Sequence, residues 1–143
     1  STLIDNLSFA APILSQKNIK LLIEPINTID IPGYWLNKTS DAISIIKEIK
    51  QENLFLQYDI YHMQIMEGNL SRNIKKLIDL IGHIQIADNP GRNEPGTGEL
   101  NYKKIFEYLN NSDYDGWIGC EYAPKTNTLE SLKWVREYGV INA

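Results

Sequence analysis

Four short apolar segments of this chain each end on a carboxylate or a carboxamide, and this recurrence constrains the fold more than any other feature. The segments end at Glu24, Asp59, Gln85 and Glu121, at intervals of 35, 26 and 36 residues. A parallel strand buried on both faces reads as a nearly continuous apolar run, so a charged group at its carboxyl end is costly unless it has a function there. The intervals are typical of βα units, whose strand ends converge at one mouth of a sheet or barrel. We therefore expect these four residues to share one polar site.

Apolar periodicity predicts the other elements of the fold. The expected strands are 19–24, 54–59, 82–87 and 117–121. The expected helices are 2–16, one whose apolar face is Ala42, Ile45, Ile46 and Ile49, and then 70–80, 101–109 and 129–138. Thr39, Ser40 and Asp41 offer an N-cap for the second of these helices, and residues 88–99 have the Gly, Pro and Asn content of a loop. The order is a helix followed by four βα units, which is about half of an eight-stranded TIM barrel. Residues 1–143 are therefore expected to form a single α/β domain with a parallel sheet.

Composition and charge argue against several classes of partner. The chain has 143 residues, 43% of them hydrophobic and 22% charged, which is ordinary for a globular domain. The formal net charge of −4 disfavours a nucleic-acid partner, because only Arg72, Lys75 and Lys76 approach the basic cluster that phosphate binding needs. No apolar stretch approaches the ~18 residues of a membrane span, and no signal peptide is visible. The single cysteine, Cys120, is typical of a reducing compartment, so we expect a cytoplasmic protein without membrane or nucleic-acid partners.

The strand-end residues have the chemistry of a hard-cation site. Mg²⁺ and Mn²⁺ prefer oxygen ligands, and Glu24, Asp59, Gln85 and Glu121 offer four of them. A single strand-end carboxylate is more often a capping or loop residue, but four in equivalent positions favour a shared site. Glu24 and Glu121 also suit acid–base catalysis next to a carbonyl, in which one takes a proton from carbon and the other returns it or serves the oxygen. We expect no organic cofactor.

Two further residues are candidates for substrate binding, each with a structural alternative. His62 follows a strand end in the segment YDIYH, where it can contact substrate or serve as a hydrogen-bonded structural residue. Arg92 lies in the loop NPGRNEPGTGE, where it can hold a substrate carboxylate through two parallel hydrogen bonds or pair with Glu94 or Glu99. His83 lies at a strand start, and we interpret it as structural.

A family resemblance is carried by four segments: EPIN with the following PGYWL, then LQYDIYHMQ, GHIQIADNPGRNEPGTGE and YDGWIGCEY. In order and spacing they resemble the hydroxypyruvate isomerase family of the xylose-isomerase-like TIM-barrel superfamily, over nearly the whole chain. The resemblance implies interconversion of hydroxypyruvate and 2-hydroxy-3-oxopropanoate (tartronate semialdehyde). It implies paired acid–base glutamates at Glu24 and Glu121, metal positions at Glu24, Asp59, Gln85 and Glu121, and substrate contacts from His62 and Arg92. Many relatives have a histidine where this chain has Gln85, so the metal ligand set departs from the family pattern there.

The resemblance also predicts an incomplete barrel. The chain corresponds to the last helix of the first half followed by units five to eight. A half barrel exposes two strand edges and an apolar interior, so we expect a fragment, a separate domain or the product of a half-length gene that self-associates. Two alternatives to this isomerase stay open. One is an epimerase or isomerase of the same superfamily that acts on another small sugar or hydroxy acid, and the other is a non-catalytic half-barrel remnant or interaction module. The superfamily's endonuclease chemistry is disfavoured, because it uses several histidine-bound metals and this chain has two histidines.

Overall fold

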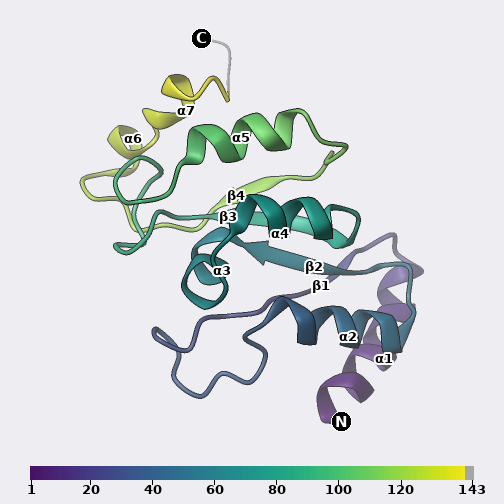
Figure 1. The fold of residues 1–143 in the computed structure, drawn as a ribbon. Coiled ribbons are helices and arrows are strands. Elements are labelled where there is room, and N and C mark those ends of the chain that lie inside the picture. The colour runs from purple at the N-terminus through teal and green to yellow at the C-terminus, as the bar shows by residue number, and fades with distance from the viewer. Residues whose placement is uncertain (141–143) are drawn as a thin grey trace.

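The computed structural model describes residues 1–140 and contains a parallel sheet in the order β1-β2-β3-β4 (Figure 1). The strands are β1 (Leu21–Ile23), β2 (Leu54–Asp59), β3 (Ile81–Ile86) and β4 (Ile118–Cys120). The helices are α1 (Thr2–Ser15), α2 (Thr39–Ile49), α3 (Ile60–Met66), α4 (Leu70–Leu77), α5 (Tyr102–Asn110), α6 (Thr128–Ser131) and α7 (Trp134–Glu137), with a 3₁₀ turn at Ile78–Leu80. Neighbouring strands are parallel and joined through helices, which confirms the predicted α/β fold of a helix and four βα units.

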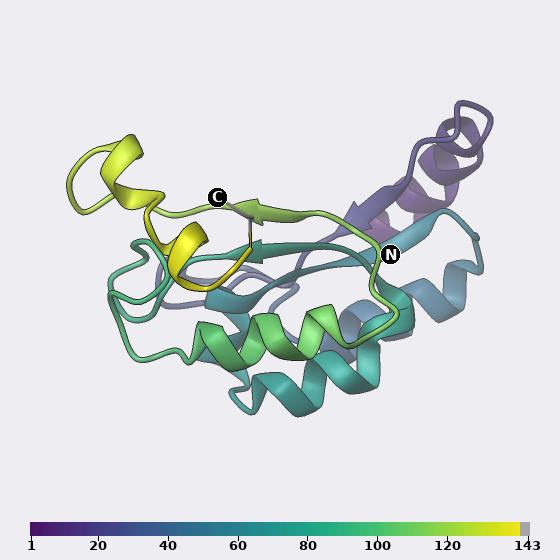
Figure 2. The ribbon, with the colours of Figure 1, turned by 90° about the horizontal axis from the view of Figure 1, so that it is seen from above.

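The helices α2, α4 and α5 pack on one face of the sheet, and within the described residues no helix covers the middle of the other face (Figure 2). The alternation along β2 reflects this difference. Leu54, Leu56 and Tyr58 are buried in the core with the helices, whereas Phe55 and Gln57, on the opposite face, are half-buried. This is the layering of a barrel wall, with helices outside and the inner strand face open.

The strand register brings the carboxyl ends of the strands to one edge. Asp59, the last residue of β2, pairs with Gln85 of β3. Ile86 of β3 pairs with Cys120, which immediately precedes Glu121. Since all the strands run in the same direction, the polar residues at their ends lie at the same mouth, as the spacing in the sequence predicts.

The amino end of α2 differs from the prediction based on Thr39, Ser40 and Asp41. The N-cap position is Lys38, which makes no side-chain capping hydrogen bond. Instead, the Glu67 carboxylate accepts the backbone N–H of Thr39 over 2.8 Å and the Thr39 hydroxyl over 3.0 Å. A negative charge at this end also interacts favourably with the helix dipole. The cap thus comes from another helix end, which local spacing cannot reveal.

Three helical segments also differ from the predicted ranges. Residues 60–66 form α3, a helix that periodicity does not predict. It begins there because the preceding Asp59 supplies its N-cap. The predicted helix 70–80 ends earlier as α4 and continues as the 3₁₀ turn, and the predicted helix 129–138 is divided into α6 and α7. Over residues 1–140, none of the helices is long and apolar enough to cross a membrane.

Candidate active site

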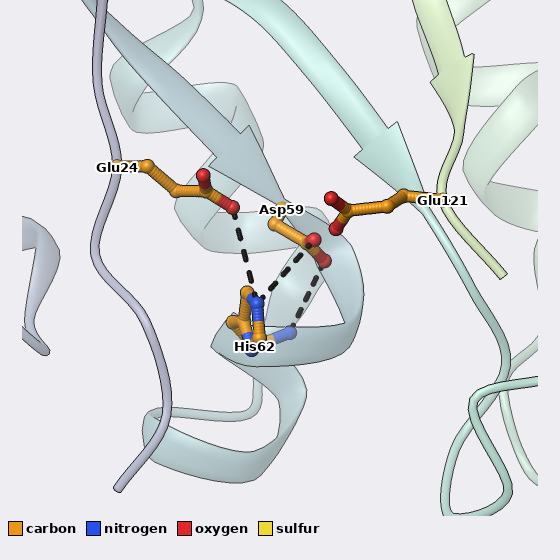
Figure 3. A group of neighbouring side chains, drawn as sticks. All are labelled: Glu24, Asp59, His62 and Glu121. Atoms are coloured by element: carbon orange, nitrogen blue, oxygen red, sulfur yellow. Dashed lines mark hydrogen bonds and ion pairs between the residues drawn. The ribbon is translucent and has the colours of Figure 1, made fainter. Parts of the chain in front are cut away.

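Four ionisable side chains meet at the carboxyl edge of the sheet (Figure 3). Glu24 follows β1, Asp59 ends β2, Glu121 follows β4, and His62 lies in the first turn of α3. Each side chain offers one potential ligand atom, and these atoms lie within 4.8 Å of one another. The structure therefore brings together three of the predicted strand-end residues, and His62 joins them because α3 begins directly after β2.

Asp59 is the most buried carboxylate of this group, with 1% of its side-chain surface exposed. Its Oδ1 atom accepts the backbone N–H groups of Tyr61 (2.8 Å) and His62 (3.2 Å), which caps α3 and fixes the side chain. Burial raises the pKa of Asp59, the His62 N–H opposes this rise, and the charges of Glu24 and Glu121 add to it. Three carboxylates in so small a volume therefore favour a proton or a cation between them.

Gln57 connects two of the predicted site residues, although no sequence motif singles it out. Its Nε2 atom donates to Oε2 of Glu24 and to Oε1 of Gln85, both over 2.7 Å. Burial raises the pKa of Glu24, while the hydrogen bond from Gln57 lowers it. The available signal was the two-residue spacing from Asp59, which puts both side chains on the same face of β2.

Arg92 lies at the rim of the site, beside Glu121. Its guanidinium donates to Oε2 of Glu121 over 2.7 Å, and another of its nitrogens is 3.9 Å from Oδ2 of Asp30. The guanidinium carbon also lies 5.1 Å from the centre of the Tyr61 ring, a cation–π distance. The alternative pairing with Glu94 or Glu99 is therefore wrong, since Arg92 faces the acidic cluster.

The loop that carries Arg92 is held by Asp88, a second residue that spacing did not single out. The buried Asp88 carboxylate accepts the backbone N–H groups of Asn89 (2.9 Å), Gly96 (2.8 Å) and Leu100 (3.1 Å). Three N–H donors converge on one carboxylate, so both ends of the loop are tied to the end of β3. Arg92 thereby reaches Glu121 from a loop whose backbone is held at three points.

The two histidines have different environments. His62 is 2% exposed, and burial lowers its pKa, with the nearby Arg92 charge lowering it further. Its Nδ1 atom lies 2.6 Å from Nδ2 of Asn27. His83 is half-buried within β3, where its ring lies against Gly119 of β4, and it is not part of the acidic cluster.

The donor set of the cluster fits a hard divalent cation. Glu24, Asp59 and Glu121 contribute carboxylate oxygens. Gln85 pairs with Asp59 in the register of β2 and β3 and offers an amide oxygen. Oε1 of Gln85 already accepts one hydrogen bond from Gln57, but a carbonyl oxygen has a second lone pair. Oxygen ligands of this kind match Mg²⁺ and Mn²⁺ better than softer metals.

The sheet, its outer helices and the acidic strand ends define a barrel-type α/β protein with its site at the carboxyl mouth. The chain belongs to the xylose isomerase-like TIM barrel family, which matches residues 1–138. It is similar to hydroxypyruvate isomerase of Escherichia coli (strain K12), with 53% identity over 138 residues. That match covers 96% of this chain and 54% of the relative. It is also 49% identical over 138 residues to 2-oxo-tetronate isomerase of Cupriavidus necator, with coverages of 96% and 53%.

Solved structures also match this chain over about half of their own length. A crystal structure described as an AP endonuclease of family 2 from Brucella melitensis superposes with a TM-score of 0.92 at 42% identity, covering 96% of this chain and 53% of that one. The 3-keto-D-glucoside 4-epimerase of E. coli superposes with a TM-score of 0.83 at 29% identity, with coverages of 94% and 52%. The chain thus spans about half the length of the relatives it matches.

Proposed function

We propose that this chain carries the acid–base site of an isomerase that interconverts hydroxypyruvate and 2-hydroxy-3-oxopropanoate. The main support is the approach of Glu24 and Glu121 from opposite sides of Asp59 (Figure 3). The reaction moves a proton between adjacent carbons, and two carboxyl groups near one bound substrate can serve it as base and acid. Similarity to hydroxypyruvate isomerase over 96% of the chain supports the choice of substrate.

Arg92 is the proposed anchor for the substrate carboxylate. It is a cationic group in contact with the acidic cluster, and 32% of its side chain is exposed at the mouth. Its present bond to Glu121 uses one side of the guanidinium fork, and a substrate carboxylate can take a bidentate pair in its place. The reacting carbons of a three-carbon acid then lie over the carboxylates.

Proton transfer is assigned to the glutamate pair. One glutamate takes a proton from C3 of hydroxypyruvate, and the electron pair moves toward the C2 carbonyl to give an enediolate. A proton is then delivered to C2, while the C3 hydroxyl proton passes to the C2 oxygen, so the aldehyde forms at C3. Burial raises the pKa of Glu24, which suits a group that has to accept a proton during the reaction. The negative charge of the enediolate has to be stabilised within the site.

A divalent cation, Mg²⁺ or Mn²⁺, is part of the proposal. Glu24, Asp59, Gln85 and Glu121 would hold it, and the bound ion would act as a Lewis acid toward the substrate oxygens. Burial of Asp59 between two other carboxylates supports this, because a cation relieves their mutual repulsion. His62 is proposed to contact a substrate oxygen.

The proposed activity is tested by following hydroxypyruvate conversion by proton NMR in D₂O. Glu24→Gln and Glu121→Gln should each lower the rate by about 10²-fold or more, which is the usual size of an acid–base contribution. Glu48→Gln, which removes an exposed carboxylate of α2, should leave the rate unchanged. No conversion by any of these proteins, the unmodified chain included, would favour the non-catalytic alternative.

Substrate class is tested at Arg92. Arg92→Lys keeps the charge but loses the planar fork, so KM for hydroxypyruvate should rise by about 10-fold or more with a smaller change in kcat. A parallel assay with 2-oxo-tetronate and with neutral ketoses separates an acid isomerase from a sugar epimerase. Faster turnover of a neutral ketose than of either acid would overturn the assignment.

We also propose that a second copy of the chain covers the open face and edges of the sheet. β1 and β4 each have one strand neighbour among the described residues. Trp117, which precedes β4, is 85% exposed, and Phe9 on α1 is 74% exposed. Light scattering at micromolar concentration should give a mass above that of one chain, and Trp117→Lys should lower it while Lys103→Glu on the solvent side of α5 should not. A stable monomer would contradict this proposal.

A further inference from the structure

The side chain of Asn27 is completely buried, and its orientation is determined by the backbone. Its Oδ1 atom accepts the backbone N–H groups of Ile29 (3.0 Å) and Asp30 (2.8 Å), as in an Asx turn. Only the oxygen of a carboxamide can accept hydrogen bonds, so these two donors define which end of the amide is Oδ1. The other end, Nδ2, must then face away from the turn.

Nδ2 of Asn27 has a partner for each of its two hydrogens. One is Oδ2 of Asp30 at 3.1 Å, and the other is Nδ1 of His62 at 2.6 Å. The carboxamide nitrogen can only donate, so Nδ1 of His62 must accept with its lone pair. In the neutral imidazole ring, the proton is then on Nε2.

The Nε2–H group of His62 faces the acidic cluster without a close partner there. Its nearest carboxylate oxygens are Oδ2 of Asp59 at 3.7 Å and Oε1 of Glu24 at 3.9 Å, both beyond hydrogen-bond distance (Figure 3). A ring nitrogen that carries a proton cannot coordinate a metal ion. It can donate a hydrogen bond to an oxygen that enters the space between the carboxylates.

We propose that Asn27 is a positioning residue that holds His62 in the Nε2-protonated tautomer, so that His62 donates a hydrogen bond into the site and does not ligate metal. Geometry alone groups His62 with the carboxylates as a potential metal ligand. The contact with Asn27 divides this group into three carboxylates that can coordinate a metal ion and one histidine that donates a hydrogen bond. The tautomer assignment holds without the proposed activity, whereas the identity of the accepting oxygen, a substrate hydroxyl or carbonyl, rests on it.

The tautomer is read directly from the ring nitrogens by two-dimensional proton–nitrogen NMR without substrate. At about pH 8, above the usual histidine pKa of ~6.5, His62 should show a pyrrole-type shift at Nε2 and a pyridine-type shift at Nδ1. The chain has two histidines, so a His83→Gln variant assigns the signals. The reverse pattern in the unmodified protein would overturn the proposal, whether or not any variant folds.

A matched pair of variants tests the part played by Asn27. Asn27→Asp keeps an oxygen for the turn but replaces the donor to Nδ1 with an acceptor, so Nδ1 should become protonated and its pyridine-type signal should be lost. Asn6→Asp, at an exposed position of α1, should leave the His62 spectrum unchanged. Retention of the original tautomer in folded Asn27→Asp would show that Asn27 does not control it.

Addition of Mg²⁺ provides the second arm of the test. The Nε2 proton of His62 should persist while the carboxyl signals of the cluster shift. Loss of that proton on addition of Mg²⁺ would identify His62 as a ligand and overturn the inference. Because no turnover is measured, an inactive protein with the expected tautomer contradicts only the proposed activity.

Discussion

Gln57 donates a hydrogen bond from Nε2 to Oε2 of Glu24 over 2.7 Å, from within β2 to the residue that follows β1. The contact joins a neutral side chain of one strand to a carboxylate of the next. It stabilises the charged form of Glu24 in a setting where burial favours the neutral form. Gln57 therefore adjusts the proton affinity of a proposed acid–base residue.

Gln57→Leu should raise the pKa of Glu24 further. The hydrogen bond from Gln57 stabilises the charged form of Glu24, and a hydrogen bond to a charged group contributes ~1.5–3 kcal/mol, so its loss favours the protonated carboxyl. Carbon-13 NMR titration of the Glu24 carboxyl measures the change, and Gln16→Leu at an exposed position is the control. An unchanged titration would mean that other groups control the proton affinity of Glu24.

Asp59→Asn should make the metal-free protein more stable at pH 8 but not at pH 4. The folded-state pKa of Asp59 is raised above its unfolded value, so the folded protein binds the proton more tightly. Stability is then fully present below the unfolded pKa and is lost as pH rises through the folded pKa. Asparagine removes the buried charge and keeps an oxygen that can accept the N–H groups of Tyr61 and His62.

The expected gain for Asp59→Asn at pH 8 is on the order of 1–3 kcal/mol in the free energy of unfolding. Denaturant titrations at pH 4 and pH 8 measure it, with the exposed Asp113→Asn as the control. Equal stability differences at both pH values would show that the charge of Asp59 is not the cause.

Mg²⁺ or Mn²⁺ should raise the melting temperature of the unmodified protein, and the effect should grow between pH 5 and pH 8. A cation that binds the folded state alone stabilises it, by about 2.7 kcal/mol at a concentration 100 times its Kd. Protons compete for the same carboxylates, of which Asp59 holds its proton tightly. Glu24→Gln should weaken the shift, whereas Glu107→Gln, at an exposed position of α5, should leave it unchanged. A shift of equal size in Asp59→Asn would exclude the cluster as the binding site.

Asp88→Asn should destabilise the protein by about 1–3 kcal/mol and raise KM for hydroxypyruvate. The new NH₂ group would face the N–H of Gly96, and two donors cannot bond to each other. One of the three hydrogen bonds that hold the loop is therefore lost. Arg92, which this loop carries, would then lose its fixed approach to Glu121. Chemical denaturation and steady-state kinetics measure the two effects, and Asp79→Asn, at an exposed position, is the control. An unchanged KM despite lower stability would separate Asp88 from substrate binding.

Local patterns in the sequence were sufficient for the architecture. Apolar runs that end on polar residues predict β2 with both of its bounds, and helical periodicity predicts the helices that cover the outer face of the sheet. The same pattern predicts that Glu24, Asp59 and Glu121 converge, since parallel strands share one carboxyl edge. Burial of alternate residues in a strand follows from the order of apolar and polar residues, so it can be predicted without knowing which distant residues are in contact.

The partners of the site residues depend on side chains that are far apart along the chain. Asn27 reaches His62 across 35 positions, and Arg92 pairs with Glu121 across 29 rather than with a neighbour in its own loop. Glu67, not a local residue, caps α2. An acceptor can bond to any donor that the fold brings within about 3 Å, whatever its position in the sequence. Spacing along the chain therefore does not predict these contacts.

The sequence by itself therefore determined the α/β class, the order of the units and the group of carboxylates at the mouth, because these follow from periodicity and strand direction. Only the tertiary structure decided how each carboxylate is hydrogen-bonded, which partner Arg92 has and which nitrogen of His62 faces the site. The physical reason is that proton affinity and tautomer depend on burial and on contacts within a few ångströms, which exist only once the chain has folded.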